Sequence, residues 1–526
     1  MDILKAYYRK NQLYTILLVA LFLRLLASFF SKGYAFHDDH FDVIRVAQNW
    51  AFGLPHWIES NVPPKHSMLY PALNASILWV LDEIGVRDPI AKTTVLRVLH
   101  AFYSLLIVLL SFRITELISN RRDAVLVAWI VAVLWFMPYL SVKFLAELVC
   151  VPPVLYGFYL IIKDDRKKQK SLGYLAAGTL FAVAFSIRMH IILFAGGLGL
   201  VLLLERKWLQ SIYFTSAFLV TSCVLIAIPD LLFFEYPFQY VVNYFTHNAE
   251  NANNYIGGSP LKFLLTTFGF LVPPVSVMLM WGYVRTWQVE KKIFLAVLIF
   301  FLVHSLFPNK QERFILPMYP LLIIMGVVGW NQFIENAKFR VSFPKLLSGC
   351  WSFFWIINGI AALALSLTYS KKDRVAPMHY LYKKSDLSSL IVESVRPNAK
   401  QVPVYYLGQQ AADYTDFQKG NILGMNDMKR SREYLKNDMP FVFVLGSNKT
   451  ISQLGKELKS VNRDPNYIIF KGDAGLQKRI QRVMPLFPGK ELIFETRIEP
   501  STFDKMLHKL NPRRHRNEEA HLYRIE

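Results

Sequence analysis

Long apolar runs alternate with short polar segments along most of this 526-residue chain. Leu13–Phe30, Val95–Phe112 and Leu261–Trp281 are examples, and each approaches the ~20 residues that a helix needs to cross a bilayer. By this length rule we count about eleven spanning helices before residue 370. The pattern therefore predicts an all-α, polytopic membrane domain over residues 1–370.

The pattern changes after residue 370, where the long apolar runs end. Short β-branched and aromatic segments there are typical of strands, and others have helical spacing. The expected strands are Gln401–Gly408, Pro440–Gly446, Tyr467–Gly472 and Glu491–Ile498, and the expected helical stretches are Ser385–Val395 and Ile451–Leu458. We expect a small soluble α/β domain over residues 371–526.

Charge gives the expected orientation. The net charge of +21 would suggest nucleic acid in a soluble protein, but Lys and Arg concentrate here in short loops between apolar runs. If the spans alternate, these basic loops and the N-terminus share one side, which is then cytoplasmic. The C-terminal domain is then extracytoplasmic, and nucleic acid is not an expected partner.

The opposite side receives the long Ser31–Lys92 segment and most of the remaining polar residues. Within it, His37–Phe52 and Ser67–Leu81 have apolar residues at helical spacing, typical of helices that lie along a membrane interface. Because these polar residues share one side of the membrane, the sequence predicts an active site at the extracytoplasmic interface.

The segment that follows the first apolar run contains two adjacent carboxylates, Asp38 and Asp39. Neighbouring carboxylates repel, which can raise one pKa into the range of a general base. A solvated helix start is one alternative, because Asp is favoured there. A divalent metal held by His37, Asp38, His40 and Asp42 is another, which we do not favour.

A second polar block, Lys310-Gln-Glu-Arg313, lies between two apolar runs and is framed by prolines. Lys310 and Arg313 suit a phosphate ligand, and Glu312 could orient the arginine. The alternative is that the two cations only contact lipid headgroups as interface anchors.

Three further residues stand out by position. Arg188 interrupts an apolar hairpin, where it suits either a lipid phosphate or a turn that reaches water. Glu147 follows Lys143 by four residues, the spacing of one helix face. His66 begins a predicted interfacial helix, where a structural or acceptor-contacting role is expected.

These motifs resemble those of the membrane mannosyltransferases of glycosyltransferase family 22, which extend GPI anchors and lipid-linked oligosaccharides. Asn309–Phe314 resembles their His-Lys-Glu-x-Arg-Phe motif. Asp38–Phe41 is similar to their first-loop acidic pair, and His66–Pro71 to their Arg-Ser-x-Leu-Tyr-Pro segment. The resemblance covers about residues 10–370.

The resemblance implies a GT-C fold and a polyprenyl- or dolichyl-phosphate-linked mannose as donor, with inversion at the outer face and without a nucleotide sugar. We expect no cofactor. The resemblance also implies Asp38 as the base, with Asp39 as a close rival. Lys310 and Arg313 would hold the departing lipid phosphate. Arg188, which stands out by its position alone, is a further candidate for binding the same phosphate.

Two departures limit the transfer of roles. The family's His is Asn309 here and its Glu is Gln311, so those roles are not carried over, and Glu312 falls at a variable position. We therefore expect only supporting roles for Glu312, Glu147, His66 and His40.

Other functions fit parts of the same pattern. A related GT-C transferase could modify lipid A or protein with another lipid-phosphate sugar. A transporter should have charges near the bilayer midplane in two repeated halves, whereas here they gather at one face. The acceptor is expected to be a glycan or glycolipid hydroxyl. The long C-terminal domain favours a bacterial inner membrane over the endoplasmic reticulum.

Overall fold

The computed structural model describes residues 11–37, 39–52, 68–167, 172–254, 257–336, 343–395, 402–408, 412–413, 440–462, 464–511 and 518–526. The chain forms two compact units, which we describe separately. The helical unit comprises Met1–Ser28, Pro64–Tyr70 and Arg97–Leu367. The mixed unit comprises Phe29–Pro63, Pro71–Leu96 and Thr368–Glu526. Phe29–Pro63 and Pro71–Leu96, which follow the first apolar run, thus belong to the same unit as the C-terminal residues. The domain boundary that we expect at residue 370 stays a prediction.

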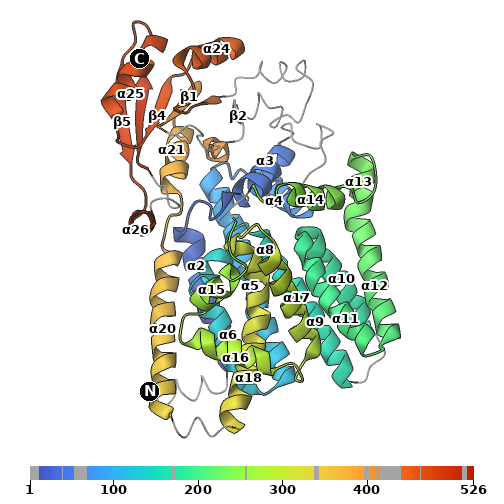
Figure 1. Ribbon diagram of the computed structural model, residues 1–526. Coiled ribbons are helices and arrows are strands. Elements are labelled where there is room, and N and C mark those ends of the chain that lie inside the picture. The colour runs from blue at the N-terminus through green and yellow to red at the C-terminus, as the bar shows by residue number, and fades with distance from the viewer. Residues whose placement is uncertain are drawn as a thin grey trace. The chain divides into compact units, whose positions relative to one another are not determined.

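The helical unit is built from apolar helices joined by short turns (Figure 1). In chain order these are α2 (Gln12–Phe30), α5 (Pro89–Ile118), α6 (Arg121–Val133), α7 (Met137–Leu140), α8 (Ala146–Val149), α9 (Val151–Lys167), α10 (Leu172–Ile187), η3 (Met189–Ile191), α11 (Ile192–Leu204), α12 (Trp208–Ser222), η4 (Cys223–Ala227), α13 (Ile228–Phe233), α14 (Gln239–Glu250), α15 (Lys262–Phe270), α16 (Val275–Arg285), α17 (Lys291–Leu306), η5 (Glu312–Met318), α18 (Tyr319–Asn336) and α20 (Pro344–Ser366).

The prediction of eleven spanning helices is not confirmed. Within the described residues, 6 helices are long and apolar enough to cross a membrane, or up to 7 if α15 and α16, bent by 117°, form one span. Several expected spans are helical but short: α17 has 16 residues, about 24 Å at ~1.5 Å per residue. The hydropathy pattern located the helices but not the points where they bend or end.

A buried arginine links three helices of this unit. Arg24 on α2 is fully buried, and its Nε donates to Ser104 Oγ on α5 at 3.0 Å. Its Nη1 donates to the carbonyl of Ala132 on α6 at 3.2 Å. Polar groups that bond across helices stabilise packing where apolar contacts alone are not directional.

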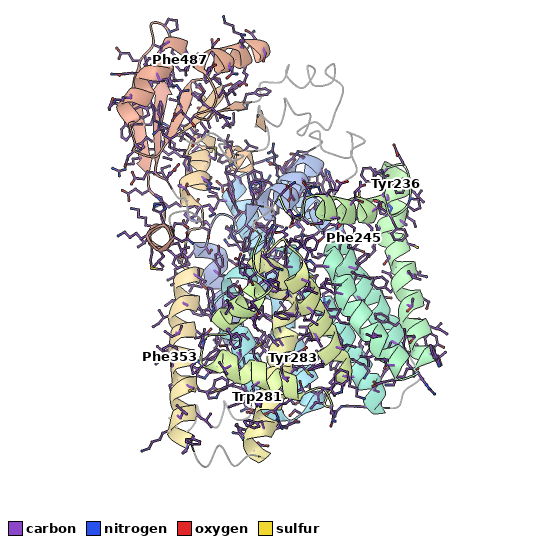
Figure 2. The ribbon with its side chains drawn as sticks, viewed as in Figure 1. Tyr236, Phe245, Trp281, Tyr283, Phe353 and Phe487 are labelled. Atoms are coloured by element: carbon purple, nitrogen blue, oxygen red, sulfur yellow. The ribbon has the colours of Figure 1, made fainter. Side chains whose placement is uncertain are left out.

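Glycines allow α16 and α18 to pack closely. A Cβ at Gly282 would lie 2.0 Å from the carbonyl oxygen of Gly326, and one at Gly329 would lie 2.1 Å from the oxygen of Gly282. Small residues are the usual way for membrane helices to bring their backbones together. On the outward faces large apolar side chains are exposed, such as Trp281 (48%) and Phe353 (50%), as expected of helices that face lipid (Figure 2).

The mixed unit contains a six-stranded sheet in the order β2-β3-β1-β4-β6-β5. Its first four strands in that order are parallel, and β6 and β5 add to the edge in antiparallel fashion. The strands are β1 (Ser389–Ser394), β2 (Ala412–Asp413), β3 (Phe441–Leu445), β4 (Tyr467–Lys471), β5 (Leu492–Ile498) and β6 (Ala520–Ile525). The helices are η1 (Asp39–Ile44), α3 (Arg45–Ala51), α4 (Leu69–Glu83), α21 (Lys372–Tyr382), η6 (Val404–Leu407), α24 (Ile451–Val461), α25 (Leu476–Val483) and α26 (Thr502–Leu510).

The α/β character of the C-terminal segment is confirmed, with two local corrections. The expected helix at 385–395 is the central strand β1, whose Leu-Ile-Val run is buried between two neighbours. The expected strand at 401–408 is the short 3₁₀ helix η6. Short apolar runs do not distinguish a buried strand from a helix, because both bury every side chain.

Candidate active site

Three charged residues from separate elements meet inside the helical unit. Glu147 is the second residue of α8 and is 1% exposed. Its Oε1 lies 2.7 Å from Nη2 of Arg188, which follows α10, and 3.6 Å from Nε of Arg313 in η5. Two guanidinium groups thus converge on one buried carboxylate. Within the triad two cations face one carboxylate, and the forked guanidinium groups are suited to an anion such as phosphate.

The expectation that Glu147 and Lys143 share one helix face is wrong. Lys143 precedes α8 and lies outside any helix, with its ammonium 4.9 Å from the centre of the Tyr139 ring. The contact that matters for Glu147 is instead with arginines 41 and more residues away in sequence.

Lys310 fixes the loop between α17 and η5. Its ammonium donates to the carbonyls of His304 (2.9 Å), Ser305 (2.6 Å) and Phe307 at the C-terminal end of α17, and the residue is 2% exposed. A cation here satisfies carbonyls that the helix leaves unpaired and suits the negative end of the helix dipole. Burial, and then the nearby Lys262 ammonium, lower the pKa of the Lys310 amine.

The structure corrects which neighbour supports Arg313. Its Nε donates to Oε1 of Gln311 at 3.1 Å, whereas Glu312 pairs with Lys262 at 3.0 Å. The Lys262 ammonium also donates to the carbonyl of Lys310. Lys262 begins α15, so it joins that helix to the motif loop. Sequence reasoning missed Lys262, although a lone cation at the start of an apolar run was a signal.

Together the triad and the loop carry four cationic and two anionic side chains, namely Arg188, Lys262, Lys310, Arg313, Glu147 and Glu312. This set has a surplus of two positive charges. Guanidinium and ammonium groups are the side chains that bind phosphate esters, so the composition of this set is suited to such a ligand.

One aromatic ring lies close to both guanidinium groups. The guanidinium carbons of Arg188 and Arg313 lie 5.8 Å and 5.5 Å from the centre of the Phe314 ring. Burial raises the pKa of the Tyr244 hydroxyl on α14, and the triad supplies the charges close enough to affect it. Apolar walls strengthen electrostatic interactions with a ligand because they exclude water.

In the mixed unit, Asp39 closes the turn at the start of η1. Its two carboxylate oxygens accept hydrogen bonds from the backbone amides of Ala35 (3.2 Å) and Phe36 (3.0 Å), and the residue is 3% exposed. These bonds fix the backbone of the acidic segment. Asp38 lies outside the described residues, as does His66.

His40 is enclosed by aromatic rings. Its ring stacks on Tyr34 and Tyr406, with centroid separations of 4.8 and 5.3 Å, and it is 1% exposed. Burial, with smaller effects of Arg45 and His37, lowers the pKa of His40 to about 3. A neutral, stacked histidine positions the η1 segment.

Comparison with known proteins gives the family. The model of the Alg9-like mannosyltransferase family matches residues 15–407. The chain belongs to this family. GPI mannosyltransferase 3 of Saccharomyces cerevisiae is 30% identical over 98 residues, which span 18% of this chain and 15% of the yeast protein. The predicted kinship with family 22 is thereby confirmed.

Solved structures confirm the fold. The chain is similar to ArnT from Cupriavidus metallidurans bound to undecaprenyl phosphate, with a TM-score of 0.61 and 11% identity over 97% of both chains. It is also similar to the oligosaccharyltransferase AglB from Archaeoglobus fulgidus in complex with an inhibitory peptide and a dolichol-phosphate (TM-score 0.51, 11% identity, 93% of this chain and 73% of that chain). With its long apolar helices and its family, the chain is a multi-pass membrane protein of GT-C fold.

Proposed function

We propose that this chain is a glycosyltransferase that moves a mannose, or another hexose, from a polyprenyl- or dolichyl-phosphate donor to a hydroxyl of a glycan or glycolipid. The observation that carries the proposal is the buried Glu147–Arg188–Arg313 triad, within a chain of the Alg9-like family. A site with surplus positive charge at helix ends suits a lipid phosphate as leaving group.

The reaction exchanges one C–O bond for another. The acceptor hydroxyl oxygen attacks the anomeric carbon of the sugar from the face opposite the phosphate. The bond between that carbon and the phosphate oxygen breaks, and its electron pair leaves with the lipid phosphate. A base takes the hydroxyl proton, and no cofactor is needed. Because the oxygen attacks once, from the face opposite the phosphate, the configuration at the anomeric carbon inverts.

Arg188 and Arg313 act on the leaving phosphate in this scheme. Their forked guanidinium groups present donors that match phosphate oxygens, and the charge that they meet grows in the transition state. Glu147 holds both groups in place before the donor arrives. Lys310 adds charge while its donors keep the loop closed on α17.

For the base we propose Asp38, as the family resemblance implies. The bonds of Asp39 to two backbone amides support a different role for that residue, namely to shape the turn that carries its neighbour. We further propose that the active site is extracytoplasmic and the N-terminus cytoplasmic, on the basis of the charges of the loops. The length of the C-terminal domain supports a bacterial inner membrane as the location.

Paired variants test these assignments. With a polyprenyl-phosphate mannose donor, Asp38→Asn should abolish transfer while donor binding persists, and Asp39→Asn should lower transfer together with thermal stability. Arg313→Lys keeps the charge but loses the fork, so it should weaken transfer more than binding. Lys291→Met, at an exposed start of α17, serves as the control. Full transfer by both Asp variants would refute the mechanism.

A further inference from the structure

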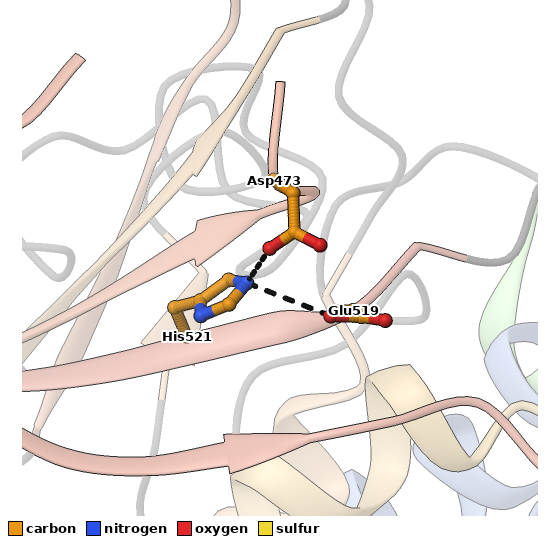
Figure 3. A group of neighbouring side chains, drawn as sticks. All are labelled: Asp473, Glu519 and His521. Atoms are coloured by element: carbon orange, nitrogen blue, oxygen red, sulfur yellow. Dashed lines mark ion pairs between the residues drawn. The ribbon is translucent and has the colours of Figure 1, made fainter. Parts of the chain in front are cut away.

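Three potential metal ligands meet at one end of the antiparallel strands in the mixed unit (Figure 3). Asp473 follows β4, Glu519 immediately precedes β6, and His521 lies within β6. Nε2 of His521 is 2.5 Å from Oδ1 of Asp473 and 3.8 Å from Oε2 of Glu519. Ligand atoms of a tetrahedral zinc ion lie roughly 3.3 Å apart, between these two values.

The histidine supplies a second, independent observation. His521 is 5% exposed, and its Nε2 faces the carboxylates of Asp473 and Glu519. At 2.5 Å this nitrogen pairs with Oδ1 of Asp473, so a buried imidazole and a carboxylate are already held together. A metal ion bound to Nε2 would replace this contact and use both carboxylates at the same time.

Arg497 on β5 holds the carboxylates in the structure. Its Nε and Nη2 lie 2.6 Å and 2.5 Å from Oε2 of Glu519, and its Nη2 lies 3.7 Å from Oδ2 of Asp473. The side chain of Arg497 is 47% exposed, so it can turn into solvent on its flexible stem. It therefore competes with a cation for the same ligands, which makes it a useful probe.

We propose that Asp473, Glu519 and His521 form a site for a divalent transition-metal ion, with Zn²⁺ as the preferred ion. An imidazole and two carboxylates are suitable zinc ligands, and water would complete the coordination at this partly exposed position. The bound ion would join the end of β4 to the start of β6. This inference is independent of the proposed transfer reaction.

The test is calorimetric titration of ZnCl₂ into the full-length chain, purified in detergent and treated with a chelator. Wild-type protein should bind one Zn²⁺ that His521→Ala and Asp473→Asn each weaken at least about tenfold. Arg497→Gln should tighten binding, because it removes the competing cation. His508→Ala, a histidine of α26 outside the cluster, should titrate like wild type.

The variants decide between a metal site and an ordinary ion-pair network. If Asp473→Asn and His521→Ala bind Zn²⁺ as wild type does, or if Arg497→Gln weakens binding, the proposal is overturned. Should His521→Ala fail to fold, Asp473→Asn decides alone, since its side chain is 60% exposed and contributes little to the core.

Discussion

Replacing Glu147 by Gln removes the only carboxylate of the Glu147–Arg188–Arg313 triad while keeping the shape of the side chain. The change leaves Arg188 and Arg313 beside a neutral amide in a buried position. Both guanidinium groups then lose the attraction of the Glu147 carboxylate. We expect the variant to be destabilised in the absence of donor and to depend on an anionic ligand for its stability.

The structure sets the scale of this effect. The charges of Glu147 and Arg188, 2.7 Å apart, attract by about 6 kcal/mol at an effective dielectric constant of ~20, before the cost of desolvation. Breaking a buried pair on one side usually costs about 3–5 kcal/mol. For a chain of 526 residues, such a loss should lower the unfolding temperature by about 3–5 °C.

Thermal unfolding in detergent, with and without polyprenyl phosphate, measures both effects. In wild-type protein, ligand at ~100 times its dissociation constant should add about 2.7 kcal/mol of stability. At the same ligand concentration, polyprenyl phosphate should raise the stability of Glu147→Gln by more than that of wild type, because the phosphate replaces the missing negative charge. In an Arg188→Met background the same Glu147→Gln change should cost less stability, since one of the two cations is gone.

Two results would refute this reasoning. One is a Glu147→Gln variant as stable as wild type, which would mean that the triad has no net electrostatic value. The other is a smaller stabilisation by polyprenyl phosphate in the variant than in wild type, which would mean that the phosphate does not bind at the two arginines.

Three further changes test other parts of the account. Lys262→Met should lower the transfer rate about tenfold, because the loop loses the contacts of Lys310 and Glu312 with α15. An unchanged rate in a transfer assay would contradict this. His40→Phe should make the free energy of unfolding less dependent on pH below about 6.5. In wild-type protein the buried His40 resists protonation, so stability is complete above pH ~6.5 and falls as the pH drops toward about 3. The loss amounts to at most about 5 kcal/mol, and the phenylalanine variant should not show it. Equal pH profiles of unfolding temperature would refute it. Gly329→Ala should lower the free energy of unfolding by about 2 kcal/mol, because its Cβ would lie 2.1 Å from a carbonyl oxygen. Gly349→Ala should leave it unchanged, because a Cβ there meets no atom within 4 Å. Denaturation curves of the two variants and wild type test this difference.

The sequence predicted the helices better than their ends. Apolar runs determine where a membrane helix forms, so α2, α5 and α20 lie where hydropathy placed them. The lengths of apolar runs do not locate bends such as the one between α15 and α16, where Pro273 and Pro274 interrupt the helix. The same limit explains β1, where burial on both faces removed the alternation that marks a strand.

The sequence singled out the charged residues of the triad one by one, but it did not predict their contacts with each other. Arg188, Glu147 and Arg313 stood out as charges beside apolar runs, yet nothing in their spacing indicated that they meet. Lys310 was predicted to bind phosphate, and its bonds to carbonyls of α17 give it a capping role that sequence could also have suggested. Charge at a membrane edge thus marked the residues, and only the fold assigned their contacts.

The central claim is that the sugar arrives on a lipid phosphate rather than on a nucleotide. The purified chain should be incubated with polyprenyl-phosphate mannose or GDP-mannose together with a panel of glycan and glycolipid acceptors, and the products followed by mass spectrometry. The account predicts release of polyprenyl phosphate and a mannosylated product with wild-type protein, both lost in Arg313→Met. Consumption of GDP-mannose with the lipid-linked donor left intact would contradict it.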